Sequence, residues 1–162
     1  MPVVSKVFKG FSLFLLVAVI TGCVQQNYKS TKTSVELQAI QTRDFDTSKK
    51  IAFASTMSTF QDLGYKVSSA DLETGFITAE GPTSDKFVVF VGQVMETLKA
   101  TAYVEALTQN RSRIRLSFVN EMKRSSGYGM EGGNDVPVEE PLFYQNSFAK
   151  IKKGIYLREN ME

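Results

Sequence analysis

The chain has no histidine, no tryptophan and only one cysteine, Cys23, among its 162 residues. Histidine is the usual base near neutral pH and the commonest metal ligand, so its absence excludes histidine-based triads and the usual zinc sites. No other acid–base motif replaces it. A single cysteine also rules out an intramolecular disulfide, so packing has to stabilise the fold. We therefore expect no enzymatic activity, no bound metal and no cofactor other than a covalent lipid.

Cys23 directly follows a short apolar segment near the start of the chain. Lys6 and Lys9 come first, the apolar run at 11–20 follows, and small residues come next. This order is typical of a secretory signal peptide. The alternative is an uncleaved anchor, but the run is shorter than the roughly 20 apolar residues that a membrane-spanning helix needs. We predict a signal peptide at residues 1–22, cleaved between Gly22 and Cys23.

The residues "ITGC" at 20–23 resemble the lipobox of bacterial lipoproteins. The resemblance implies that a diacylglyceryl group is attached to the sulfur of Cys23, which becomes the first residue. A thiolate is the nucleophile that this chemistry requires. A free thiol or an intermolecular disulfide is the alternative use of a lone exported cysteine. Val24 stands where an aspartate would resemble an inner-membrane retention signal, so the resemblance implies the outer membrane and leaves the leaflet open.

The rest of the chain is electrically balanced. Losing Lys6 and Lys9 with the signal leaves 17 basic and 17 acidic side chains. This balance provides no overall attraction for nucleic acid, so we expect none as a partner. Residues 23–34 are polar without an apolar period, which predicts a flexible tether. Residues 35–160 are long enough for one globular domain.

Periodicity in this domain predicts an α+β fold, an antiparallel sheet packed against helices in the order β-α-β-β-α-β-β-α. Alternation predicts the first strand at 35–43. The first helix is expected at 47–63, with Asp46 or Thr47 as its N-cap. Gly64 suits the left-handed position after this helix, where a Schellman motif would place Tyr65 against Phe60.

Three further elements have clear signals. A hairpin is predicted to turn at 72–75. Residues 124–135 hold four glycines and no apolar period, which predicts a long loop. The last helix is expected at 141–157, because Pro141 suits a first helical position and apolar residues follow at helical spacing. These residues are Tyr144, Phe148, Ile151 and Ile155.

Two segments in the middle of the domain require a choice. Residues 84–98 contain "FVVFV", which favours a strand by propensity, but their apolar residues also follow a helical period. We interpret this segment as a helix. The next two segments alternate as a hairpin, and a three-residue loop at 109–111 would pair Ala106 with Ile114 and Glu105 with Arg115.

Four residues are candidate contacts for a partner or for lipid headgroups. Arg111, Arg113 and Arg115 share one face of a predicted strand, and Tyr128 lies in the glycine-rich loop. For the arginines, the alternative is an ordinary solvated face of a half-buried sheet. Asp44 and Asp46 could form an acidic pair, but helix capping explains them better.

The mature chain also resembles a group of small bacterial lipoproteins. The residues that carry this resemblance are "QTRDFDT" (41–47), "FQDLGY" (60–65), "ETGFITAE" (73–80), "RIRLSFV" (113–119) and "EEPLFYQNSFAKIKKGIYLREN" (139–160). The arrangement resembles more loosely the helix-grip domains of the β-barrel assembly lipoprotein BamC. These resemblances supply no catalytic residues.

We therefore predict a lipid-anchored envelope protein that acts as a non-catalytic interaction or accessory assembly component, with a membrane anchor and an envelope protein partner. The alternative is a carrier or chaperone for lipid or another apolar ligand. A carrier would need a pocket between the sheet and the last helix, lined by residues such as Phe148 and Ile151.

Overall fold

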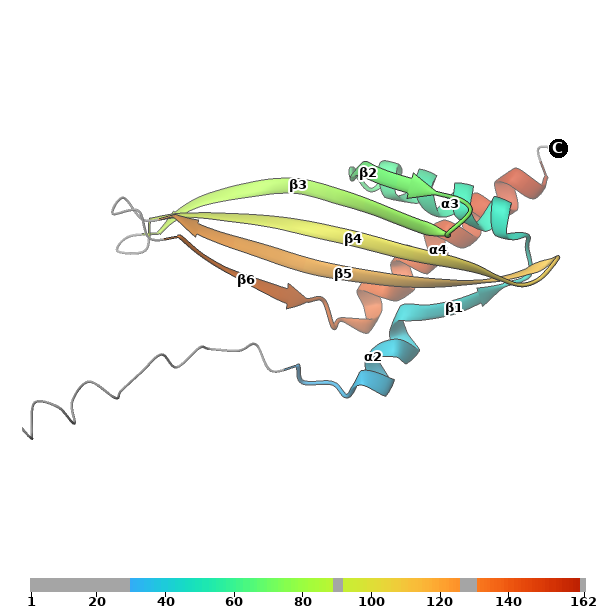
Figure 1. Ribbon diagram of the computed structural model, residues 1–162, viewed down its shortest axis with the longest axis horizontal. Coiled ribbons are helices and arrows are strands. Elements are labelled where there is room, and N and C mark those ends of the chain that lie inside the picture. Colours follow the sequence, from blue (N-terminus) through green and yellow to red (C-terminus); the bar gives the residue numbers. More distant parts are fainter. Residues whose placement is uncertain (1–29, 89–91, 126–130, 161–162) are drawn as a thin grey trace, which may run out of the picture.

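The computed structural model describes residues 30–88, 92–125 and 131–160 (Figure 1). The predicted signal peptide, Gly22, Cys23, Tyr128 and the first part of the predicted tether lie outside the described residues. The elements are α2 (Ser34–Gln41), β1 (Thr42–Phe45), α3 (Lys49–Asp62), β2 (Lys66–Asp71), β3 (Phe76–Val88), β4 (Gly92–Thr108), β5 (Arg111–Ser125), β6 (Glu131–Pro137) and α4 (Pro141–Glu159). The predicted α+β class is confirmed.

All six strands form one antiparallel sheet, in which five follow the order β1-β5-β4-β3-β2 and the sixth, β6, pairs with β5. β4 occupies one side of β5 along its length, and β1 and β6 pair with different stretches of the other side. The helices α3 and α4 lie behind the sheet in Figure 1. The 17 residues of β4 extend over roughly 55 Å, whereas the 19 residues of α4 extend over roughly 28 Å. The strands therefore continue well beyond the helices.

The core lies where α3 and α4 cover the sheet. Alternate residues of the two central strands are fully buried there: Ala100, Ala102, Val104, Ile114, Leu116 and Phe118. The ring of Phe118 lies 6.1 Å from that of Phe60 in α3 and 5.5 Å from that of Tyr144 in α4, centroid to centroid. Aromatic packing thus joins both helices to the centre of the sheet.

The two long helices match their predictions closely. In α4, Pro141 is the first helical residue, and Tyr144, Phe148, Ile151 and Ile155 are buried as their spacing predicts. In α3 the Schellman motif is present: the amide of Tyr65 donates to the carbonyl of Phe60 at 2.9 Å. The N-cap prediction is wrong. Ser48, not Asp46 or Thr47, accepts the hydrogen bond from the first turn.

The strand predicted at 35–43 is wrong, because residues 34–41 form the helix α2. Thr33 and Glu36 build a complete capping box, each side chain bonded to the backbone of the other residue. At the other end of the helix, the Gln41 amide donates to the Tyr144 hydroxyl at 3.3 Å. Strong capping and this tertiary contact outweigh a short alternating pattern, and the strand begins only at Thr42.

The helix predicted at 84–98 is also wrong. Residues 83–88 of β3 pair with residues 92–97 of β4, and residues 93–98 of β4 also pair with β5. The β-branched and aromatic residues of this segment favour extended backbone, and pairing on both sides of β4 satisfies its amides and carbonyls. The apparent helical period was coincidental.

The predicted three-residue loop at 109–111 is wrong. Thr108 pairs with Arg111, so the turn holds two residues, Gln109 and Asn110. The predicted pair of Ala106 with Ile114 is also wrong, because Ala106 pairs with Ser112 and Val104 with Ile114. The buried faces of the two strands still match, through a register shift between Ala106 and Thr108. A β-bulge in β4 therefore aligns the buried faces of the two strands, which we had expected a three-residue loop to do.

The long loop predicted at 124–135 is largely replaced by strands. β5 continues to Ser125, and residues 131–137 pair with it as β6, while 126–130 lie outside the described residues. Pairing with a neighbour overrides the low strand propensity of Gly132 and Gly133. A Cβ at Gly133 would lie 3.0 Å from the Met122 carbonyl oxygen, a tight contact that glycine avoids. Within the described ranges, none of the helices combines the length and apolar character needed to cross a bilayer.

Candidate interaction surface

One face of the sheet has no helix over it, and we call it the open face. Directly paired residues share a face, so the register assigns its members. None of them is buried, in contrast to the alternate residues that face the helices. In β3, β4 and β5 they are Phe76, Thr78, Glu80, Thr83, Asp85, Gln93, Met95, Thr97, Lys99, Thr101, Tyr103, Glu105, Arg113, Arg115, Ser117, Val119, Glu121 and Lys123.

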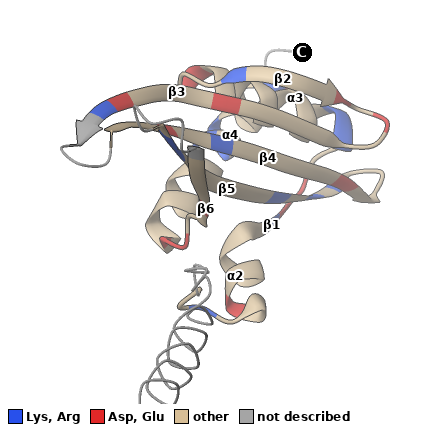
Figure 2. Cartoon of the chain, turned by 60° about the vertical axis from the view of Figure 1, so that its left-hand side comes forward, with Lys and Arg blue, Asp and Glu red and all other residues tan. Residues whose placement is uncertain are grey.

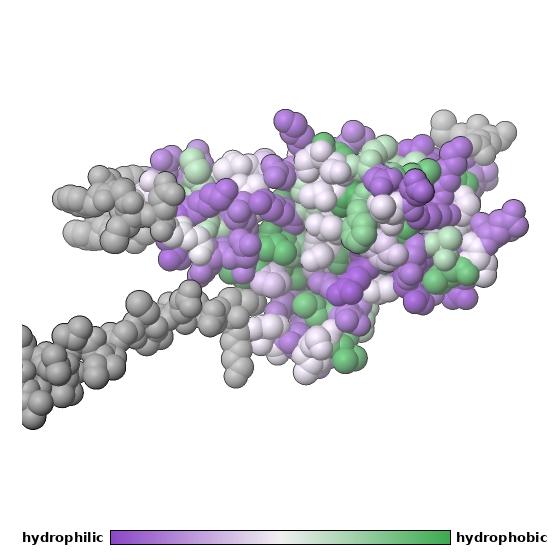
Figure 3. Space-filling model, viewed as in Figure 1, coloured by the Kyte–Doolittle hydropathy of each residue, from purple (hydrophilic) through white to green (hydrophobic). Residues whose placement is uncertain are grey.

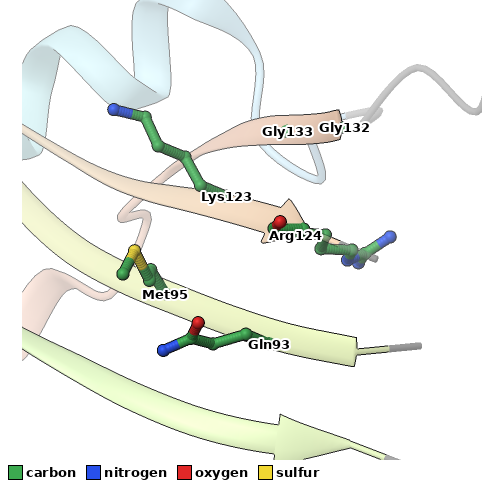
Figure 4. A pocket seen from close by; sticks show the side chains of 7 residues that line it. Gln93, Met95, Lys123, Arg124, Gly132 and Gly133 are labelled. Carbon is green, nitrogen blue, oxygen red and sulfur yellow. The ribbon is translucent and has the colours of Figure 1, made fainter. Parts of the chain in front are cut away.

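Two adjoining hollows lie on this face, toward the end of the sheet that extends beyond the helices. The larger has a volume of about 530 Å³ and the smaller about 260 Å³. Met95 and Lys123 line both hollows, which therefore adjoin at these two side chains, and we call the pair of hollows the depression. The larger is also lined by Gln93, Arg124, Ser125, Gly132 and Gly133 (Figure 4). The two glycines carry no side chain that could fill the space.

The smaller hollow contains a network of charges. The Lys99 ammonium lies 3.0 Å from the Glu121 carboxylate, and that of Lys123 lies 3.5 Å from the same group. The hydrogen bond between Lys99 and Glu121 raises the pKa of Lys99 and lowers that of Glu121. Two lysines thus share the carboxylate of Glu121, and Glu80, which pairs with Lys99, adds a second carboxylate to the lining of this hollow.

Apolar side chains stand toward both ends of the open face. Met95 contributes at the hollows, and the rings of Phe76 and Tyr103 stack with centroids 4.8 Å apart near the other end. Phe76 is 52% exposed. Between them the Thr83 and Thr97 hydroxyls are 2.9 Å apart. The face is a mixed surface, as its hydropathy shows (Figure 3), and acidic and basic residues are interspersed along the strands (Figure 2).

The three arginines predicted as contact residues lie near β1. Asp44 accepts hydrogen bonds from Arg113 at 2.7 Å and from Arg111 at 3.1 Å. The Arg113 hydrogen bond is the main cause that lowers the pKa of Asp44. Arg115 donates to the Gln41 side chain at 3.4 Å. Their role in partner or headgroup contact stays a prediction.

Sequence reasoning missed the role of Asp44, which joins β1 to two arginines of β5 rather than capping a helix. It also placed Glu105 opposite Arg115, whereas Glu105 pairs with Arg113, with 4.0 Å between their charged groups. Relative to the prediction, the two-residue turn shifts the register by one residue, and the bulge in β4 shifts it by one more.

The cavity expected of a carrier would lie between the sheet and α4. Phe148 and Ile151 are buried in the core instead, and the Phe148 ring packs 6.2 Å from that of Phe45. Neither hollow of the open face includes them. In the part of the chain that the structure describes, no group of three or more acidic or cysteine side chains is placed to hold a metal ion.

Comparison with known proteins gives a likeness in structure only. No protein-family model matches the chain, and no curated protein matches it. A TBP-like protein from Parabacteroides distasonis is similar over 71% of this chain and 90% of its own, with 13% identity and a TM-score of 0.38. A DUF4468 family protein from Bacteroides ovatus is similar over 70% of this chain and 84% of its own, with 9% identity and a TM-score of 0.39. Both proteins are bacterial, and a likeness at this level carries no argument about function.

Proposed function

We propose that this chain is a lipid-anchored protein of the bacterial envelope, held at the outer membrane through Cys23, and that it acts without catalysis by presenting its open face to a protein partner. The "ITGC" sequence after a short apolar run supports the anchor. The observation that supports the interaction role is the open face of the sheet, with the depression that Met95 and Lys123 help to line.

The chemistry of the open face suits protein recognition. Interfaces between proteins combine apolar and aromatic side chains with polar groups that form hydrogen bonds. Met95 and the Phe76–Tyr103 pair provide the apolar contacts, and the two lysines that share Glu121 provide charge. The depression at Met95 and Lys123 offers a concave surface in which a partner's side chain could be desolvated, as at interface hot spots.

Site-specific photocrosslinking in living cells tests this proposal. A photoreactive residue replaces Met95 or Thr97 on the open face, and in a matched control it replaces Lys152, which is exposed on α4. We expect one recurrent protein adduct from both open-face positions and none from the control. Adducts only from position 152, or equal yields from all three positions, would contradict the proposal.

A charge reversal adds a second test in the same cells. Lys123→Glu should lower the yield of the position-97 adduct at least about fivefold, because residues at the centre of an interface carry most of its affinity. The control Lys152→Glu makes the same charge change on the helix side and should leave the yield unchanged. An equal loss with both substitutions would point to a general effect of charge and would count against the open face.

A further inference from the structure

The chain is fastened to the domain four residues before α2 begins. The Ser30 and Thr31 hydroxyls both donate to the carboxylate of Glu139, the latter at 2.7 Å. The Thr31 amide donates to the same carboxylate at 3.2 Å. Hydrogen bonds to a charged acceptor are stronger than those between neutral groups. Since Glu139 lies two residues before α4, this contact fixes where the chain leaves the domain.

This contact shortens the tether that sequence reasoning had extended to residue 34. From Cys23 to Ser30 the chain covers seven residue steps, which span at most roughly 25 Å when fully extended. If Cys23 carries lipid, the part of the domain around Ser30 cannot lie farther than this from the lipid surface. We call this part, residues 30–36 and 139–142, the anchor-side end.

Two apolar side chains are exposed at the anchor-side end. Val35, in the first turn of α2, is 75% exposed, and Leu142, in the first turn of α4, is 58% exposed. The two helices lie beside each other, as the hydrogen bond between Gln41 and Tyr144 and both views of the chain show (Figures 1 and 2). The contact of Ser30 and Thr31 with Glu139 holds the chain just before α2 next to the chain just before α4, so the first turns of both helices lie close to the exit of the chain.

The charges at this end favour one kind of membrane surface. Glu36 accepts hydrogen bonds from Thr33, Glu139 accepts those of Ser30 and Thr31, and Glu140 is exposed. Against these three glutamates, Lys32 lies within this end and Lys29 directly precedes it in the sequence, which leaves a small net negative charge. A net negative end would be repelled by anionic lipids, whereas a zwitterionic surface imposes no such cost.

We propose that the anchor-side end rests on a zwitterionic phospholipid surface, with Val35 and Leu142 inserted at the boundary between headgroups and acyl chains. This inference rests on the proposed lipid anchor at Cys23. Two inserted apolar side chains add a weak contact to a strong anchor, so they set the orientation of the domain and not its attachment.

Fluorescence quenching tests this orientation, and the absence of tryptophan from the chain allows single-tryptophan variants. Val35→Trp and Leu142→Trp report on the anchor-side end. Tyr156→Trp is the control, because Tyr156 is 64% exposed and lies about 21 Å farther along α4. The mature chain, from residue 23, is coupled through Cys23 to a maleimide phospholipid and mixed into phosphatidylcholine vesicles with brominated acyl chains.

We expect bromine to quench Val35→Trp and Leu142→Trp at least about twofold more than Tyr156→Trp, since interfacial side chains sit roughly 5–10 Å into the lipid. Equal quenching at the three positions, or none at 35 and 142, would overturn the inference. Tryptophan emission that shifts with protein concentration, and not with bromination of the lipid, would show that the anchor-side end contacts a second copy of the chain. That result would also overturn the inference. Chemical coupling supplies the lipid, so a result here does not depend on whether cells acylate Cys23.

Replacing both Ser30 and Thr31 by alanine provides a further variant. Without the two hydroxyls, the backbone amide of residue 31 can still donate to Glu139, but the contact is weaker, so the domain gains reach and rotational freedom. Quenching of Val35→Trp should then decrease. Unchanged quenching would show that the contact with Glu139 does not orient the domain.

Discussion

At the scale of single residues, two glycines with similar backbone angles have different surroundings. Gly64 has a φ of 83° and open space where a Cβ would be, and Gly75 has a φ of 87°. A Cβ at Gly75 would lie 2.1 Å from the Val104 carbonyl oxygen. The same glycine accepts a hydrogen bond from the Val104 amide at 2.8 Å. Gly75 therefore allows the β2–β3 hairpin to pack closely against β4.

We predict that Gly75→Ala destabilises the domain more than Gly64→Ala. Gly64→Ala should cost about 1 kcal/mol, the penalty for a side chain in the left-handed region. Gly75→Ala has this penalty and adds roughly 1–3 kcal/mol for overpacking against backbone that cannot move aside. Urea unfolding of the two variants measures the difference directly. Equal losses of stability would show that the backbone around Val104 yields without cost.

At the scale of elements, β1 is a strand of only four residues, and one of them, Asp44, also binds the sheet through its side chain. The carboxylate of Asp44 binds both Arg111 and Arg113 of β5. Because the Arg113 hydrogen bond lowers its pKa in the folded state, Asp44 contributes stability above its unfolded pKa, about 3.9. That contribution is lost as the pH falls through the lower, folded pKa.

Asp44→Asn should therefore reduce stability more at pH 7 than at about pH 2, because the contribution of Asp44 decreases once the pH falls below its unfolded pKa. The loss is small, because the pair is partly exposed to solvent and salt screens it. The control is Asp46→Asn, two residues away and exposed. Urea unfolding at both pH values gives the comparison. A loss that stays the same at low pH would contradict the electrostatic explanation.

Elements with signals inside their own sequence could be predicted, and elements that depend on distant partners could not. The helices α3 and α4 have caps, helical spacing and terminal Gly64 or Pro141, so their positions were predicted within about two residues. The segment at 84–98, the register at Glu105 and the strand β6 all depend on pairing with another strand. Strand propensity alone does not decide such pairing.

The candidate site shows the same division. Alternation placed Glu105 and the three arginines on one face of the sheet, and the structure confirms that arrangement for Glu105, Arg113 and Arg115. The depression was not predictable, because it requires β6 and its two glycines to lie beside Lys123. The contact between Ser30 and Glu139 joins residues more than 100 positions apart, and no local pattern indicates it.

At the scale of the whole molecule, the free edge of β3 is a poor site for adding a strand. β2 pairs with β3 only as far as Glu80, so in the described residues the rest of β3 has one free edge. Pro82, Asp85 and Lys86 lie along that edge, and proline and charged residues discourage strand addition. This protection favours the open face over the β3 edge as the surface that a partner contacts.

The proposed lipid anchor determines how this elongated domain is presented. With lipid on Cys23, the short connection to Ser30 keeps the anchor-side end near the membrane. The open face, with its depression on the part of the sheet beyond the helices, then remains available to the proposed envelope partner. The proposed interaction role and the proposed orientation both require that Cys23 carries lipid.

The most direct test of this account is the intact mass of the protein extracted from its own membranes. We expect a chain that begins at Cys23, with a diacylglyceryl group on the sulfur and an acyl group on the new amino terminus. The Cys23→Ser control should lack both groups and retain its signal peptide. A parent chain that keeps residues 1–22, or one that begins at Cys23 with a free thiol, would contradict the account.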